Sequence, residues 1–352
     1  MGMQRALGSG TAYYHCVSRV VDKRVIFHSQ EKEVFRSIMR KLEEFCAVRI
    51  ITYCVMGNHF HLLVEVPDRE IIPPLNRETL SRVLPLLYDK ATVETIMMQL
   101  DSAIAAGDSS GVKAIFDRYE ARRGNLSVFL KELKQRCSIF MNRRLGRLGT
   151  LWEGPFRSVL VEGGEESLQA VAAYIDLNPV RAGLVSVPED YRWSGYGEAM
   201  GAGKWSKLAR SRLKRMQRES LERPGAGDEV IDWKTTLGRY RTLLYTEGRG
   251  VPNDAGGGRP RRGIDPGVAD EVLEGKRRLS LPEVLRRKVR YFSDGAVMGS
   301  AAFVDAAAEC LKARGVVGPN RKSGARRMRG ADWGGIRVLR ALEVRVFDPP
   351  LD

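Results

Sequence analysis

Two histidines, His59 and His61, are separated by one residue within the apolar run HFHLLVEV. Alternate side chains of a β-strand point to the same face, so both imidazoles lie on one face, about 7 Å apart. At that separation both can reach one divalent metal ion. The chain has only four histidines, and the opposite face of this run is apolar. The pattern indicates a metal site; the alternative is a pair of polar residues on a solvent-facing strand.

Tyr174 and Asn178 form a second candidate pair, four positions apart in EESLQAVAAYIDLNP. The apolar spacing predicts a helix over residues 165–177, which stops near Asn178 because Pro179 disfavours a helical conformation in the residue before it. Residues four apart share one helix face. A tyrosine hydroxyl can attack a phosphodiester and form a phosphotyrosine, and an amide oxygen can complete a metal site. The alternative is a buried tyrosine followed by a residue that ends the helix.

The preceding segments supply the elements that position these residues. Residues 12–27 read as a strand and a loop, and residues 31–47 have apolar side chains at helical spacing. Two apolar runs follow, residues 48–56 and 59–67, with a Gly-Asn hairpin signal between them. A strand, a helix and a hairpin predict an α+β fold, with a sheet that carries helices on one face.

Later segments read mainly as helices. Residues 68–124 indicate a helical insertion, and residues 126–144 a basic amphipathic helix. Residues 149–162 form a Gly-flanked extended segment that ends in a strand. Farther along we expect helices over 230–246 and 300–314. The remaining expectations are a linker at 253–264, a helix pair or broken helix at 270–291, and a basic stretch at 320–330.

The chain of 352 residues has a net charge of +15, and that charge is unevenly distributed. Residues 1–200 carry +2, whereas residues 201–352 carry +13. The length favours two domains, which we place at 1–200 and 201–352, the second being basic, Gly/Arg-rich and mainly helical. An excess of positive charge points to a polyanionic partner, and nucleic acid is the commonest one.

The composition also argues against several classes of protein. No run of 18 apolar residues and no apolar leader occurs, so we expect no membrane association. Five scattered cysteines without a CxxC pair favour neither a disulfide framework nor a zinc ribbon. These features are typical of a cytoplasmic protein.

Five segments of residues 10–200 occur together in a characteristic order, namely YYHCVSRVVDKRVIF, VMGNHFHLLVEV, NRRLGRLGTLWEGPFRS, YIDLNPVRAGLV and YRWSGY. In this respect the chain resembles the REP-associated tyrosine transposases, within the HUH single-strand transposases of small insertion sequences. The resemblance implies a ferredoxin-like antiparallel sheet. It also implies metal ligation by His59 and His61, with Asn178 near the metal, and Tyr174 as the nucleophile.

The activity implied by the resemblance is cleavage and rejoining of single-stranded DNA through a 5′-phosphotyrosine, with Mg²⁺ or Mn²⁺ as cofactor. The substrate would be a hairpin or palindromic end, such as a repetitive palindromic element, at the bacterial nucleoid. Two positions depart from the family pattern. Pro155 stands where a basic residue usually precedes the aromatic, and Cys137 and Phe140 stand where members often have tyrosines.

Binding of such DNA requires phosphate contacts and surfaces on which bases stack. We expect these contacts from seven residues near the site, namely Arg143, Arg144, Arg147, Trp152, Phe156, Arg157 and Arg181. We also expect residues 201–352, here called the extension, to add sequence-independent DNA affinity. Truncation after residue 200 should leave the cleavage chemistry in place.

Two other functions fit the same residues. One is a domesticated DNA-binding regulator that retains the fold without cleavage, and the other is a metal-dependent hydrolase that acts through water. The sequence leaves open the metal, whether the protein is a homodimer, and whether Tyr174 completes the site of its own chain or of a partner.

Overall fold

The structure is a computed structural model, which describes residues 10–219, 232–245, 285, 291–294, 296–316, 324–329 and 332–339. The predicted linker at 253–264 lies outside the described residues, as does nearly all of the predicted helical segment 270–291.

Within the described residues, seven strands form one sheet in the order β2-β3-β1-β4-β5-β7-β6. The strands are β1 (Ala12–Arg19), β2 (Arg49–Val55), β3 (His59–Val66), β4 (Arg157–Val161), β5 (Val297–Gly299), β6 (Arg326–Arg327) and β7 (Arg337–Val338). The pairs β1–β3, β1–β4 and β2–β3 are antiparallel, whereas β5 runs parallel to β4. The α+β class predicted from the sequence is confirmed.

The first four strands have the ferredoxin-like arrangement. Along the chain the order is β1, α1 (Ser29–Phe45), β2, β3, α5 (Leu126–Leu145) and β4, and the strands lie side by side as β4-β1-β3-β2. Both helices pack on the same face of the sheet, in one hydrophobic cluster with Phe60, Leu62 and Val64 of β3. The apolar face of β3, opposite the face that carries His59 and His61, therefore packs against helices, as predicted.

Local sequence explains where α1 and α5 form. In α1, Phe35, Met39 and Leu42 recur at helical spacing and are buried against the sheet. Asn125 caps α5, because its side-chain oxygen accepts a hydrogen bond from the backbone N–H of Val128 at 3.2 Å. Gly146 ends α5 in a left-handed conformation with φ = 58°, which glycine adopts without a steric penalty.

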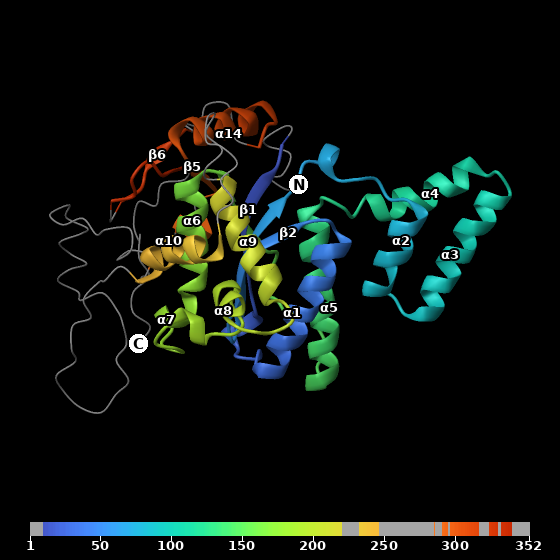
Figure 1. The fold of residues 1–352 in the computed structure, drawn as a ribbon, viewed down its shortest axis with the longest axis horizontal. Helices are drawn as coiled ribbons and strands as arrows, with labels where there is room; N and C mark the ends of the chain where they lie inside the picture. The colour runs from blue at the N-terminus through green and yellow to red at the C-terminus, as the bar shows by residue number, and fades with distance from the viewer. Residues whose placement is uncertain are drawn as a thin grey trace.

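Helices also cover the opposite face of the sheet, so the prediction of helices on one face holds only for the ferredoxin-like core. Figure 1 shows α6 and α9 on the side of the sheet away from α1 and α5. These added helices pack on Tyr13, Leu63 and Val159 in a second hydrophobic cluster. They are α6 (Glu165–Asp176), α7 (Asn178–Arg181), α8 (Gly195–Met200), α9 (Ser206–Glu219), α10 (Trp233–Tyr245) and α13 (Tyr291–Asp294). The apolar strand residues of this second face, such as Leu63 and Val159, are buried under these helices, so both faces of the sheet are covered.

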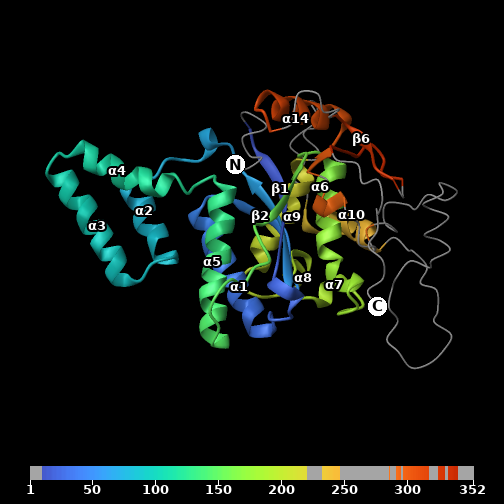
Figure 2. The ribbon, with the colours of Figure 1, turned by 180° about the vertical axis from the view of Figure 1, so that it is seen from behind.

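The insertion is helical and extends away from the sheet, beyond α5 (Figures 1 and 2). It contains α2 (Arg77–Val83), α3 (Lys90–Ala105) and α4 (Ser109–Glu120). Shorter 3-10 helices are η2 (Val21–Lys23), η3 (Arg69–Ile71), η4 (Leu84–Leu86) and η5 (Pro188–Asp190). No helix in the described part of the chain is long and apolar enough to cross a membrane.

The described parts of residues 201–352 pack into the same sheet. They include the strands β5, β6 and β7. They also include α14 (Ala301–Ala313), which corresponds to the helix predicted at 300–314, and α10, which corresponds to the one predicted at 230–246. Two arginines of α9 pair with buried carboxylates of the first part. Arg212 lies 3.0 Å from Glu43, and Arg215 contacts both oxygens of Glu65 at 2.9 and 3.1 Å. These two positive charges are therefore engaged in ion pairs within the protein rather than standing free on its surface.

Candidate functional site

His59 and His61 lie at the beginning of β3, on the face covered by α6. The β1–β3 register places Arg19 opposite His59 and Val17 opposite His61. The His59 ring is half-buried, while His61 is 5% exposed. The two ring centroids are 5.1 Å apart, with the planes at 79°. We call this side of the sheet the histidine face.

A third histidine, His15 of β1, completes the cluster on the histidine face. Its Nε2 lies 2.9 Å from Nδ1 of His61, and the two rings stack with centroids 5.1 Å apart. His15 was not among the site residues predicted from the sequence, although it lies in the motif YYHCVSR. The signal that identifies it is the antiparallel register, which sets β1 beside β3 and is not readable from local spacing.

Burial favours the neutral form of both His15 and His61. Burial lowers the pKa of His15 to about 4, because the surroundings cannot solvate an imidazolium. Burial also lowers the pKa of His61 well below its ordinary value, and His59, His15 and Arg181 nearby lower it further. Neutral imidazole is the form that binds a metal ion.

Tyr174 of α6 faces the same cluster. Its ring centroid lies 6.1 Å from that of His15 and 6.1 Å from that of His61. The structure therefore brings together Tyr174 and the His-x-His pair, which are more than one hundred residues apart in the sequence. The helix places Tyr174 here because α6 packs its apolar residues on the strands of the histidine face.

Asn178 follows Tyr174 at the start of α7 and is nearly buried. Its side-chain nitrogen donates to the backbone carbonyls of Tyr174 and Ile175, both at 3.3 Å. The amide thus closes the end of α6, which is the helix-ending role that was the alternative to metal ligation.

Residues from the extension cover Tyr174. The Phe292 ring of α13 stacks on the Tyr174 ring with centroids 4.3 Å apart and planes inclined by 19°. The Arg181 guanidinium lies 4.1 Å from the Tyr174 centroid and donates to the carbonyls of Tyr174 at 2.6 Å and Leu285 at 2.5 Å. Tyr174 is 3% exposed, so a DNA phosphate reaches its hydroxyl only if these covering groups move.

The residues predicted to bind DNA have different surroundings. Trp152 is a core residue: it is 7% exposed, its indole packs against Phe27 and Phe60, and its N–H donates to Ser138 at 2.9 Å. It therefore offers no open ring to a base, which corrects that expectation. Arg181 is partly buried and contacts Tyr174 and Leu285.

Other members of the predicted set are more accessible. Arg143, Arg144 and Arg157 are exposed, whereas Phe156 and Arg147 are partly buried. Arg144 lies 2.5 Å from the buried carboxylate of Glu31. Arg157 begins β4 opposite Val17, which in turn pairs with His61.

Arg157 therefore belongs to the row of residues that crosses the sheet through His61. Arg19 lies opposite His59, at the same end of the sheet, and is a further basic residue that was not predicted from the sequence.

The histidine pair suits a divalent metal. A metal ion about 2.1 Å from each ring nitrogen, with ligands at about 90–110°, sets the ring centroids about 4.6–5.3 Å apart, and the observed separation is 5.1 Å. Among the described residues, no cluster of three or more His, Cys, Asp or Glu side chains forms a ready-made metal site. His15 does not add a ligand, because its Nε2 is engaged by His61.

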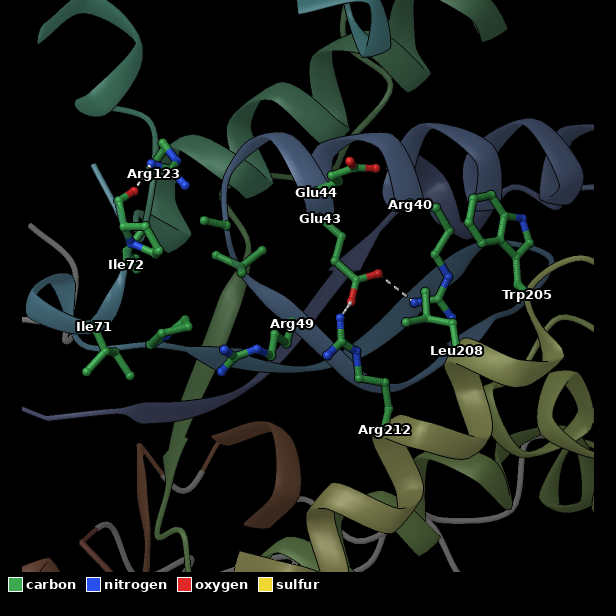
Figure 3. Close-up of a pocket in the computed structure, with 14 residues that line it drawn as sticks. Arg40, Glu43, Glu44, Arg49, Ile71, Ile72, Arg123, Trp205, Leu208 and Arg212 are labelled. Carbon is green, nitrogen blue, oxygen red and sulfur yellow. Dashed lines mark hydrogen bonds and ion pairs between the residues drawn. The ribbon is translucent and has the colours of Figure 1, made fainter. Parts of the chain in front are cut away.

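A separate pocket lies at the other end of the sheet (Figure 3). It has a volume of about 350 Å³ and is lined by Arg40, Arg49, Arg123, Arg212 and two glutamates, among others. Figure 3 shows Glu43 between Arg40 and Arg212. Its carboxylate oxygens lie 2.7 Å from Arg40 and 3.0 Å from Arg212. Arg49 pairs with Glu65, six residues along β3 from His59 and so about 20 Å away. The pocket is therefore separate from the cluster of His15, His59 and His61.

Comparison with known proteins gives one family match. Residues 9–76 match the family model described as transposase IS200 like, a range that includes His15, His59 and His61 but not Tyr174. The family resemblance seen in the sequence is thus confirmed over that range. No curated protein matches the chain.

One solved structure is similar to the chain, described as "Structure of the REP associates tyrosine transposase bound to a REP hairpin". The identity is 14%, the match covers 64% of this chain and 94% of that chain, and the TM-score is 0.35. A likeness at this level supports no argument about the site.

Proposed function

We propose that this protein is a DNA transposase that cleaves and rejoins single-stranded DNA with Tyr174 as the nucleophile. The observation that carries the proposal is the distance of 6.1 Å between the ring centroids of Tyr174 and His61. His61 lies on a strand within the IS200-like match. A phenol beside a potential metal site is the combination that phosphodiester transfer through a tyrosine requires.

In the proposed reaction the Tyr174 hydroxyl oxygen attacks the scissile phosphorus and loses its proton to solvent. The bond from phosphorus to the 3′ oxygen breaks, and that oxygen takes up a proton and leaves as a free 3′-OH. The 5′ phosphate stays on Tyr174 as a phosphodiester, so no bond energy is lost to hydrolysis. Attack by a 3′-OH on this phosphotyrosine reverses the step and joins the strands.

The chain's own residues have defined tasks in this scheme. Arg181, 4.1 Å from the Tyr174 ring, stabilises negative charge as it develops on the phenol oxygen. His59 and His61, with Asn178 once its amide turns from the helix end, would hold Mg²⁺ or Mn²⁺. Such an ion polarises a phosphate oxygen. Arg157 and Arg143 are exposed to the solvent and suited to backbone phosphates.

The decisive experiment is to search for DNA joined to tyrosine. The wild-type protein, incubated with single-stranded hairpin DNA and Mn²⁺, should yield a Tyr174-containing peptide that carries a nucleotide by mass spectrometry. Tyr174→Phe should bind the same DNA and form no adduct. Tyr88→Phe, in the connection between α2 and α3, is the matched control and should form the adduct normally. An adduct that persists in Tyr174→Phe contradicts the proposal.

The metal requirement is tested by the double variant His59→Ala, His61→Ala. It should lose metal-dependent cleavage while still binding DNA, because phosphate contacts come from other residues. Undiminished cleavage would exclude the histidines from the reaction and leave a metal-independent mechanism.

A second candidate function is a DNA-binding regulator that does not cleave. Two observations favour it: Tyr174 is buried under Phe292, and the Asn178 amide is hydrogen-bonded to the backbone at the end of α6. DNA binding without any adduct, nick or release of a 3′-OH would identify the regulator. Cleavage that survives in Tyr174→Phe, with water as the nucleophile, would identify the hydrolase. Action in the cytoplasm at the nucleoid, and assembly as a homodimer, are parts of the proposal that size measurement and localisation can test.

A further inference from the structure

A line of three polar groups runs from the extension into the candidate metal site. The backbone carbonyl of Phe292 lies 2.6 Å from Nδ1 of His15. The other nitrogen of that ring, Nε2, lies 2.9 Å from Nδ1 of His61. His15 is fully buried and His61 is 5% exposed, so water does not compete for these contacts.

The chemistry of the three groups determines where the protons are. A carbonyl oxygen can only accept, so Nδ1 of His15 carries a proton and donates it to Phe292. A neutral imidazole has one N–H, so Nε2 of His15 is bare and accepts. The hydrogen bond between the rings must then be donated by His61, and its Nδ1 carries the proton. The remaining nitrogen of His61, Nε2, has a lone pair.

We propose that His15 is a positioning residue that fixes the tautomer of His61, with the Phe292 carbonyl as its anchor, and so presents Nε2 of His61 to a divalent metal ion. The metal part of this inference rests on the proposed function; the tautomer part does not. His15 itself touches neither metal nor substrate. It acts through the hydrogen bond to His61, as an outer hydrogen-bond partner of a metal-ligating histidine commonly does.

Phe292, a residue of the extension, thereby helps to position the candidate metal ligand His61. Phe292 is far from the histidines in the sequence, yet its carbonyl determines which nitrogen of His15 is protonated. Without that acceptor, His15 could adopt the other tautomer and donate to His61. His61 would then carry its proton on Nε2, the nitrogen that a metal requires bare. The same α13 segment therefore both covers Tyr174 and sets the state of a candidate ligand.

Nuclear magnetic resonance of the full-length, metal-free protein tests the tautomers directly. Long-range correlations between ring carbon protons and ring nitrogens distinguish Nδ1–H from Nε2–H, and the chain has only four histidines to assign. At neutral pH the wild type should show His15 and His61 both protonated on Nδ1. His61 protonated on Nε2 in the wild type would overturn the inference, and this measurement needs no variant.

His15→Asn removes the acceptor for His61 while an amide N–H remains where Nδ1 lay, so the contact to the Phe292 carbonyl can persist. His61 should then acquire a population protonated on Nε2. The matched control is His28→Asn, at the exposed cap of α1, where asparagine is also a good capping residue. His28→Asn should leave the His61 tautomer unchanged. An unchanged His61 tautomer in folded His15→Asn contradicts the inference.

Calorimetric titration with Mn²⁺ alone tests the consequence for the metal. His15→Asn should bind Mn²⁺ about 10–100-fold more weakly than the wild type, and His28→Asn should bind normally. Equal affinity in His15→Asn would remove the metal role of His15. If the wild type shows the expected tautomers but binds no Mn²⁺, the positioning by His15 is supported and the metal in the proposed function is not.

Discussion

The Phe292 ring lies stacked on the Tyr174 ring, with centroids 4.3 Å apart, although 118 residues separate them in the sequence. This contact joins the basic extension to the residue proposed as nucleophile. The candidate site therefore includes contacts from residues beyond 200, whereas the expectation from the sequence placed the chemistry in residues 1–200. Leu285 and Phe292 supply carbonyl acceptors to Arg181 and His15. Truncation after residue 200 removes both acceptors and the cover of Tyr174, so it alters the site as well as DNA affinity.

The first prediction concerns this cover. Phe292→Leu keeps an apolar side chain but loses the ring pair, which is worth about 0.5–1.5 kcal/mol. The Tyr174 hydroxyl should become more accessible, and nitration of Tyr174 by tetranitromethane, followed by peptide mass spectrometry, should be faster than in the wild type. Tyr53, fully buried in the other cluster, provides an internal control that should not change. Equal nitration of Tyr174 in both proteins would mean that other residues exclude solvent from it.

The second prediction concerns the attachment of α9 to the sheet. Arg215 holds both oxygens of Glu65, a fully buried carboxylate that also pairs with Arg49. Arg215→Ala leaves this carboxylate with one partner and should lower the free energy of unfolding by about 1–2 kcal/mol, less than for a fully buried pair because Arg215 is 40% exposed.

Urea unfolding checks the value. The matched control is Arg77→Ala, which breaks the exposed pair with Asp101 and should change stability by less than about 0.5 kcal/mol. Similar losses in the two variants would show that Glu65 does not depend on α9.

Local spacing was sufficient to predict the elements that position the candidate site residues. Period-2 alternation placed His59 and His61 on one face of a strand, and helical periodicity placed Tyr174 on a helix that packs against that face. His15 could not be predicted, because its role depends on the register between β1 and β3, which tertiary packing determines.

Long-range contacts also explain the errors. Trp152 lies near basic residues in the sequence, yet it forms an isolated β-bridge with Val20, just after β1, and enters the core. Apart from the helix that carries Tyr174, the helices on the histidine face were not predicted. The strands there carry His, Tyr and Glu as well as apolar residues, a pattern typical of a solvent-facing side. The extension contributes helices and three strands from residues beyond 200, and no local pattern assigns a distant strand to a sheet edge.

The third prediction concerns DNA affinity. Arg157 is exposed beside the histidine face, so Arg157→Ala should weaken binding of a hairpin DNA and reduce the slope of log affinity against log salt by about 1. Arg144→Ala is a second variant: Arg144 lies 2.5 Å from Glu31, so a phosphate must compete with that carboxylate and the change in slope should be below about 1. Fluorescence anisotropy across a salt series measures both. Identical slopes for the wild type and Arg157→Ala would place the bound phosphates elsewhere.

The fourth prediction concerns pH and Asp176, which is buried on α6 two residues after Tyr174. Burial raises the pKa of Asp176 to about 7, and hydrogen bonds from Tyr240, the Tyr196 backbone N–H and Thr52 oppose that rise only partly. In the unfolded chain an aspartate has a pKa of about 3.9. Between about pH 4 and pH 7 the folded state therefore binds more protons than the unfolded state, and stability falls as the pH rises.

Asp176→Asn removes this titration and keeps an oxygen for Thr52 and Tyr196. The wild type should lose up to about 1.4 kcal/mol of stability per pH unit across that window relative to the variant. Tyr240→Phe should shift the upper end of the window to higher pH, because the lost donor favoured the carboxylate. Urea unfolding at a series of pH values between 4 and 8 measures all three proteins. Parallel curves for the wild type and Asp176→Asn would show that Asp176 is ionised in the folded protein throughout this range.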